Sequence, residues 1–114
     1  MSFYMLQWSY KDQQVAALVQ HPHDRYEVVS KLLKDYGGTL HSFFLSFGDY
    51  DGVAITEFPD NTAATACLLT ILRSGAVSQL KTTVLISPKE ALKAMKLAGE
   101  TTTGYLPPSA GRAD

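Results

Sequence analysis

The stretch that decides the fold is "FGDYDGVAITEF", residues 47–58. Its first part, Gly48 to Asp51, has the residue types of a tight turn, because glycine tolerates positive φ and aspartate side chains bond to nearby backbone. The second part is an alternating run with β-branched residues, which is typical of a strand. A further apolar run, "TLHSFFLSF", occupies residues 39–47. The short separation predicts an antiparallel hairpin of strands 39–47 and 51–58.

Further elements are predicted on both sides of this hairpin. An aromatic run predicts a strand at 2–10, and 76–86 alternates like a strand. Apolar periodicity and capping residues predict helices at 11–19, 24–36, 61–74 and 89–98. The order of the main elements is βαββαβ, the split pattern of a ferredoxin-like α+β domain. We therefore expect a four-stranded antiparallel sheet with helices on one face.

Length and composition limit the partners that this chain can have. A chain of 114 residues that is 46% hydrophobic suits one domain, which we place at residues 1–98, followed by a Thr-, Pro- and Gly-rich tail at 99–114. The net charge of −1 gives no electrostatic footprint for nucleic acid or an anionic membrane. Without a signal-peptide pattern, the expected location is the cytoplasm.

The strand faces predict an assembly of identical subunits. Phe3 and Met5 alternate with Tyr4, Leu6 and Trp8, so both faces of the first strand are apolar. An antiparallel sheet with helices on one side normally has a polar open side. We therefore expect the sheet of a second copy to cover the open face, which gives a homodimer of the dimeric α/β-barrel kind. The tail would pack on a neighbouring subunit through Tyr105 and Leu106.

The segment "FGDYDGVAITEFPDNTAA" also resembles the signature of the GYD domain family. In that signature, Gly48 and an acidic residue precede Tyr50 and Asp51, and Pro59-Asp60 follow the next strand and open a helix. The resemblance covers about residues 3 to 86. It implies a ferredoxin-like fold of the dimeric α/β-barrel kind, usually in bacteria. The family has no settled biochemical activity, so the resemblance sharpens the fold more than the function.

Asp49, Tyr50 and Asp51 have two interpretations. If Tyr50 closed over a cavity, its hydroxyl could orient a ligand, and Asp51 could act as a base if burial raised its pKa. In the other interpretation this is a turn, in which Gly48 has positive φ and Asp51 accepts hydrogen bonds from nearby backbone N–H groups. We favour the turn, because consecutive residues of an extended chain point in different directions.

The histidines and aromatic residues supply the other candidates. His41, on the strand face that alternation assigns to Phe43 and Leu45, is a candidate catalytic or ligand-contacting residue. His21 and His23 beside Asp24 match no specific metal motif, so no metal site is expected. Four aromatic residues are candidate ligand contacts, although a packed core is the alternative: Tyr4, Trp8, Phe43 and Tyr50. The lone Cys67 lies in an apolar run and is expected to be a buried thiol.

Two functions from different classes remain open. The first is an oligomeric binding or structural module, in which the space between the sheets is filled by side chains or holds a small apolar molecule. The second is a cofactor-independent enzyme, monooxygenase- or isomerase-like, acting on a small aromatic or carbonyl compound. In the enzyme we expect His41 and Asp51, or Tyr50, to converge on a cavity. The sequence has no Gly-rich phosphate loop, nucleophile elbow or cysteine cluster, so no cofactor is expected.

Overall fold

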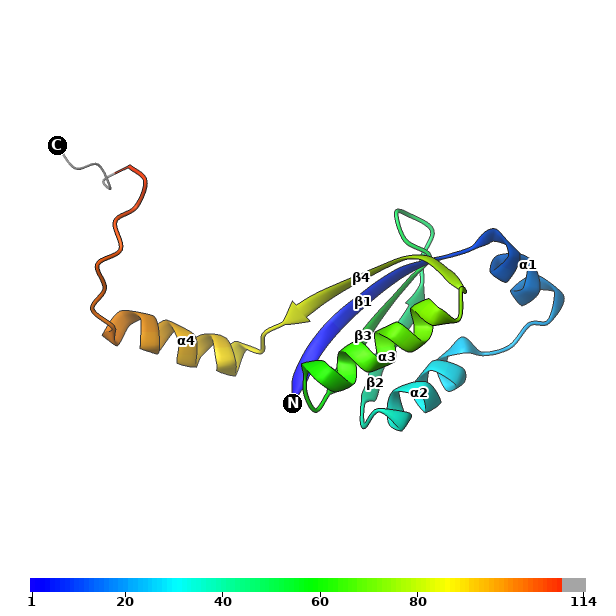
Figure 1. Cartoon of the computed structure of the whole chain (residues 1–114), viewed down its shortest axis with the longest axis horizontal. Coiled ribbons are helices and arrows are strands. Elements are labelled where there is room, and N and C mark those ends of the chain that lie inside the picture. The colour runs from blue at the N-terminus through cyan, green and yellow to red at the C-terminus, as the bar shows by residue number, and fades with distance from the viewer. Residues whose placement is uncertain (110–114) are drawn as a thin grey trace.

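The computed structural model describes residues 1–109 and contains one four-stranded antiparallel sheet in the order β2-β3-β1-β4. The elements follow one another as β1 (Ser2–Tyr10), α1 (Asp12–Gln20), α2 (Arg25–Asp35), β2 (Thr39–Leu45), β3 (Gly52–Phe58), α3 (Asn61–Arg73), β4 (Val77–Leu85) and α4 (Pro88–Glu100). Figure 1 shows α2 and α3 lying together on one face of the sheet. The predicted ferredoxin-like architecture is confirmed, and each predicted element is present within about two residues.

Local chemistry accounts for the main helix boundaries. Asp60 caps α3 by accepting a hydrogen bond from the Ala63 N–H at 2.8 Å, and Ser87 caps α4 through the Glu90 N–H at 3.2 Å. Gly37, after α2, has a φ of 73°, the left-handed conformation that commonly closes a helix. The helix predicted to end at residue 98 continues to Glu100.

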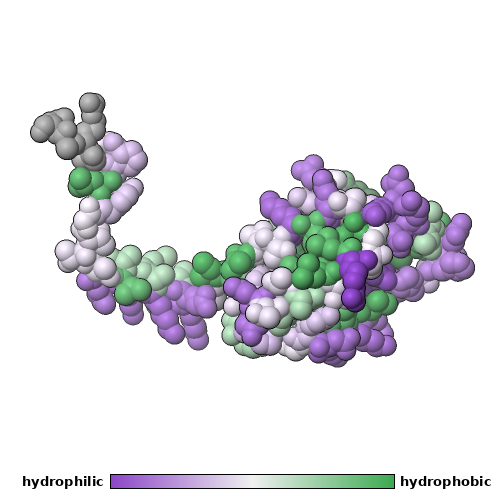
Figure 2. All heavy atoms as spheres, viewed as in Figure 1, coloured by the Kyte–Doolittle hydropathy of each residue, from purple (hydrophilic) through white to green (hydrophobic). Residues whose placement is uncertain are grey.

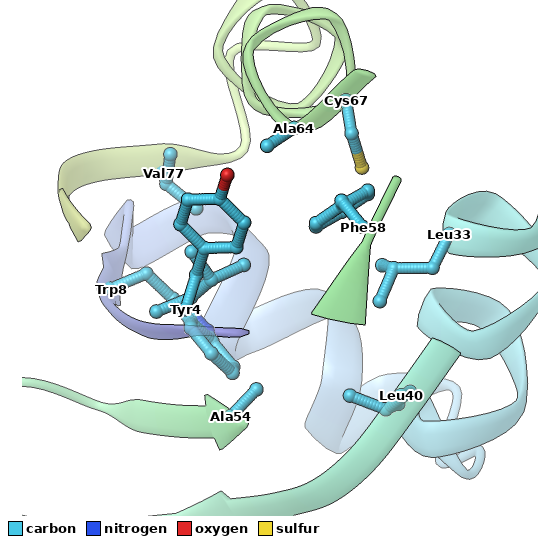
Figure 3. Close-up of a cluster of buried hydrophobic side chains, with 10 residues drawn as sticks. Tyr4, Trp8, Leu33, Leu40, Ala54, Phe58, Ala64, Cys67 and Val77 are labelled. Atoms are coloured by element: carbon cyan, nitrogen blue, oxygen red, sulfur yellow. The ribbon is translucent and has the colours of Figure 1, made fainter. Parts of the chain in front are cut away.

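The core lies between the sheet and the helices α2 and α3. Phe58 is completely buried, and Figure 3 shows its ring between Cys67 of α3 and Leu33 of α2. The ring of Tyr4 meets Phe58 edge-on with centroids 5.9 Å apart, and the Tyr4 hydroxyl donates a hydrogen bond to the side chain of Asn61. Cys67 is completely buried, which confirms the expected buried thiol, and burial raises the pKa of that thiol to about 11.

A β-bulge in β2 changes which residues face the helices. Leu40 pairs with Thr56 and Ser42 pairs with Ile55, so His41 is an extra residue in β2. Phe43 therefore shares the helix-covered face with Leu40, and Phe44 lies on the other face. The prediction that His41 lies with Phe43 and Leu45, and Leu40 with Phe44, is wrong. Strict alternation fails because one inserted residue reverses the facing of every later side chain.

The face of the sheet opposite α2 and α3 we call the open face. In the strand register its apolar members are Phe3, Met5, Phe44, Val53, Ile55 and Leu85. They alternate with polar and charged neighbours such as Gln7, Glu57 and Lys81. The open face is therefore a mixed surface with an apolar strip, because the bulge moves Phe43 to the side of the helices.

The C-terminal part of the chain extends away from the sheet. In Figure 1, α4 and the following segment project from the end of β4, and the molecule is 67 Å long. No residue of α4 is buried. Figure 2 shows that α4 is amphipathic, with hydrophobic side chains along one side and hydrophilic ones along the other. Tyr105 and Leu106 are exposed, and residues 110–114 of the predicted tail lie outside the described residues.

Candidate functional site

The turn between β2 and β3 spans residues 46–51 and is tied to the end of β1. Ser46 donates its N–H to the Asp51 carbonyl at 2.8 Å and its hydroxyl to the Tyr50 carbonyl at 2.7 Å. Asp51 donates its N–H to the Trp8 carbonyl at 2.8 Å, and its carboxylate accepts the Tyr10 N–H at 2.8 Å. The structure supports the turn interpretation, because the Asp51 carboxylate bonds to backbone as expected.

Gly48 has a different role from the one predicted. The only glycines with positive φ in residues 1–109 are Gly37 and Gly75, so Gly48 needs no left-handed conformation. A Cβ at Gly48 would meet no atom within 4 Å. At Gly52, in contrast, a Cβ would lie 2.3 Å from Cζ2 of the Trp8 ring. The glycine of this segment that packing requires is therefore Gly52, at the start of β3.

The candidate catalytic residues lie far apart within one chain. His41 bonds through Nε2 to the Glu57 carboxylate at 2.9 Å and stacks against Phe3 with centroids 5.5 Å apart, near the end of β3. Asp51 directly precedes the first residue of β3. Positions 51 and 57 are six residue steps apart along an extended chain, which corresponds to about 20 Å. The expected convergence of His41 with Asp51 or Tyr50 does not occur within the chain.

The aromatic ligand candidates lie on the side of the helices. Tyr4 and Trp8 are buried in the core, and Phe43 packs on Trp8 with centroids 5.2 Å apart. None of them belongs to the open face, where we expected a ligand between two sheets. Tyr50 is half-buried in the turn. Whether any of these residues contacts a ligand stays a prediction.

An apolar cavity of about 230 Å³ lies between α2, α3 and the sheet, and we call it the α2–α3 cavity. Residues of α2, of α3 and of the sheet, including the start of β4, form its walls. The apolar side chains that line it include Leu6, Trp8, Val28, Leu32, Ile71 and Leu80. Ala54, a small residue of the sheet, also lines it, and the helix-covered face is not completely filled here. The sequence patterns did not predict this cavity.

The Thr70 and Ser74 hydroxyls of the α2–α3 cavity are satisfied by the protein. The Thr70 hydroxyl bonds to the Ala66 carbonyl at 2.9 Å and to the Tyr36 hydroxyl at 2.6 Å. The Ser74 hydroxyl donates to the Ile71 carbonyl at 2.6 Å. Arg25, the first residue of α2, differs from these two residues, because its Nε is buried and has no hydrogen-bond partner in the described residues.

The loop before α2 holds Arg25 in this position. His23 bonds through Nδ1 to the His21 carbonyl at 3.0 Å and through Nε2 to Nη1 of Arg25 at 3.1 Å. A neutral His23 with its proton on Nδ1 satisfies both contacts. A second hollow of about 160 Å³, lined by His21 and His23, shares Arg25 and Tyr10 with the α2–α3 cavity. Within residues 1–109, no group of His, Cys, Asp and Glu could hold a metal ion.

No helix among residues 1–109 combines the length and the apolar character needed to cross a membrane.

Comparisons with known proteins agree with this architecture. The family model of the GYD domain matches residues 4–95, which extends beyond the segment of resemblance into α4. No curated protein sequence matches the chain.

Solved structures share the fold at low sequence identity. A protein from Thermus thermophilus is 15% identical with a TM-score of 0.53, covering 76% of this chain and 95% of that one. The structure described as FFRP-DM1 is 15% identical with a TM-score of 0.51, covering 75% and 100%. A transcriptional regulator from Neisseria meningitidis in complex with L-Met is 16% identical with a TM-score of 0.51, covering 93% and 56%. Identities this low show the fold alone.

Proposed function

The chain belongs to the GYD domain family, and from this premise we propose that it is a homo-oligomeric module that binds a small apolar molecule. The observation that carries the proposal is the α2–α3 cavity, with its volume of about 230 Å³ and its apolar walls. An apolar cavity of about 150 Å³ is enough to hold benzene. The α2–α3 cavity therefore has room for an aromatic ring with a short substituent.

The position of the cavity also supports binding rather than catalysis. Trp8 lines the cavity, whereas His41 is at the other end of the sheet, beside Glu57. The Asp51 carboxylate already accepts a hydrogen bond from the backbone N–H of Tyr10. The Neisseria meningitidis regulator, which has a similar fold, is in complex with L-Met. That complex is consistent with small-molecule binding by the fold, and it says nothing of the ligand of this chain.

Toluene, a neutral apolar probe, is expected to bind the folded chain and raise its thermal midpoint, because a ligand that binds only the native state stabilises it. The shift is measured by differential scanning calorimetry at increasing toluene concentration. Val28 lines the cavity from a position that is 45% exposed, so Val28→Phe can fill the space with little strain on the core. The variant should fold and lose the shift. An equal shift in the variant, or none in the native chain, would contradict binding in the cavity.

The oligomeric part of the proposal rests on exposed apolar surface. The open face has an apolar strip that includes Met5, Phe44 and Ile55, and Phe44 is 65% exposed. In α4, Leu92, Met95 and Leu97 are exposed as well. Exposed apolar patches of this kind mark interaction surfaces. We propose that a second copy of the chain covers them, with the sheets face to face.

The size of the open face suggests a contribution from α4. Four strands about 4.8 Å apart and about seven residues long at 3.3 Å per residue cover roughly 450 Å² of projected face. Two such faces together fall short of the lower limit of stable interfaces, about 1,200 Å² in total. The apolar side of α4, placed against the partner, would add the remaining area.

The native chain is expected to be a dimer or a larger homo-oligomer, and Ile55→Glu should convert it to monomer, because an unpaired carboxylate would be buried between the sheets. The molar mass is measured by light scattering after gel filtration. Leu69→Glu is the matched control, since Leu69 is a 59% exposed apolar residue on α3, away from the open face. Dissociation by Leu69→Glu alone would place the interface on the helices, and a monomeric native chain would contradict assembly altogether.

A further inference from the structure

The most informative unexplained group in the molecule is the Arg25 guanidinium. Its Nε is buried at the wall of the α2–α3 cavity and has no partner in the described residues. A buried N–H without a partner costs free energy, and it is rare in native structures. No carboxylate lies within ion-pair distance of Arg25 in residues 1–109, where the one close pair is His41 with Glu57. Within the described part of the chain, the Arg25 charge therefore has no carboxylate partner at ion-pair distance.

The contact with His23 engages one edge of the Arg25 guanidinium. His23 binds Nη1, the nitrogen on the same side as the Cδ atom. The opposite edge of the guanidinium carries Nε–H and one N–H of Nη2 in parallel. A pair of parallel N–H groups matches the two oxygens of a carboxylate. The contact with His23 thus leaves the edge that contains the buried Nε without a hydrogen-bond partner in the described residues.

From this arrangement we infer that the ligand of the α2–α3 cavity is a small aromatic or branched carboxylic acid, with its carboxylate on the Nε edge of Arg25. The inference rests on the proposed binding function and adds the chemical class of the ligand. The apolar part of the acid lies among side chains such as Trp8, Leu32 and Ile71. The carboxylate sits where the apolar cavity meets the hollow lined by His21 and His23.

The charge of the site favours a carboxylate over a phosphate. Arg25 is the single Lys or Arg side chain among the residues that line either hollow. His23 satisfies both of its contacts as a neutral ring. A phosphate carries up to two negative charges and several strong acceptor oxygens, and it generally needs more donors than one guanidinium edge provides. A monovalent anion with two oxygens matches the one charge and the two N–H groups.

Phenylacetate and phenylacetamide test the inference on the full-length chain. The two compounds have nearly the same shape, and only the first is an anion. Binding is followed by the fluorescence of Trp8, the one tryptophan of the chain, which lines the cavity, and by calorimetric titration. Phenylacetate should bind at least about tenfold more tightly than the amide, because hydrogen bonds to charged groups are stronger than neutral ones. Equal affinities for acid and amide would overturn the inference.

Variants at Arg25 test whether this residue causes the preference for the acid over the amide. Arg25→Met keeps a long apolar side chain, so it should weaken phenylacetate binding by about ten- to hundredfold and leave the amide unaffected. Arg25→Lys keeps the charge without the fork and should recover only part of the loss. Undiminished acid binding by Arg25→Met would overturn the inference. If Arg25→Met does not fold, the ratio of the affinities of the native chain for the acid and the amide is the test of the inference.

The outcomes separate this inference from the proposed function. Equal binding of acid and amide, abolished by Val28→Phe, would keep the α2–α3 cavity as a binding site and reject the anion. Failure of toluene, the amide and the acid to bind would reject the proposed function and the inference together.

Discussion

Gly52→Ala is expected to lower the free energy of unfolding by about 3 kcal/mol. The new Cβ would lie 2.3 Å from Cζ2 and 2.4 Å from Cε2 of Trp8, well inside van der Waals contact. Gly52 and Trp8 are directly paired across β3 and β1, so the ring covers the glycine. The ring cannot move aside freely, because Phe43 and Tyr10 pack against it. Either the Trp8 ring or the backbone pairing of β1 with β3 must shift.

Gly48→Ala is the matched control for this prediction, because it is the same substitution four residues earlier. A Cβ at Gly48 meets nothing within 4 Å, and the residue has no positive φ. Its effect should remain within about 0.5 kcal/mol. Urea unfolding of the three proteins, followed by circular dichroism, gives the free energies. Equal destabilisation by the two variants would show that the turn, and not the contact with Trp8, sets the requirement for glycine.

Gly52→Ala should also disturb the α2–α3 cavity. Trp8 forms part of its wall, and a displaced ring changes the space available to a ligand. Destabilisation and loss of toluene binding are therefore expected together in this variant. Gly48→Ala should leave both properties unchanged, which ties the signature segment to the cavity through Gly52 and Trp8.

Local signals in the sequence were sufficient for the elements and their order. Gly37, Asp60 and Ser87 end or begin helices through interactions within a few residues, so the chain around them determines the outcome. The hairpin was predictable for the same reason. The bulge at His41 was not, because it depends on how β2 fits β3 and no local residue type requires it. For that reason the sequence also did not predict on which face of the sheet Phe43 and Phe44 lie.

The candidate site was less predictable, because its parts meet only in the folded chain. The α2–α3 cavity depends on the distance between two helices that the sequence separates by a hairpin. Arg25 had no distinguishing pattern in "HPHDR", and the lack of a partner at its buried Nε is visible only in the folded chain. The acid pair of the turn, which was visible in the sequence, has its Asp51 carboxylate bonded to the backbone of Tyr10. The acidic residues that lie close together in sequence thus belong to a structural turn. The Arg25 guanidinium without a partner at Nε became visible only in the folded structure.

Phe58→Ala is expected to lower the free energy of unfolding by about 4 kcal/mol, the range found for phenylalanine truncated in a packed core. The Phe58 ring is completely buried against Tyr4, and it lies among residues of α2 and α3. Its removal leaves a cavity that close neighbours cannot fill without moving both helices. Since small domains are stable by only about 5–15 kcal/mol, the variant is expected to unfold at a markedly lower temperature.

Phe47→Ala makes the same chemical change at the other end of the signature segment. Phe47 is 101% exposed, so its truncation removes no core contact within the chain and should change the free energy of unfolding by less than about 0.5 kcal/mol. Both variants are compared with the native chain by urea unfolding at one protein concentration, because assembly contributes to measured stability. A loss at Phe47 that approached the loss at Phe58, and that grew on raising the protein concentration, would mean that the turn packs against a second copy. A loss at Phe58 below about 1 kcal/mol would contradict the core described between α2, α3 and the sheet.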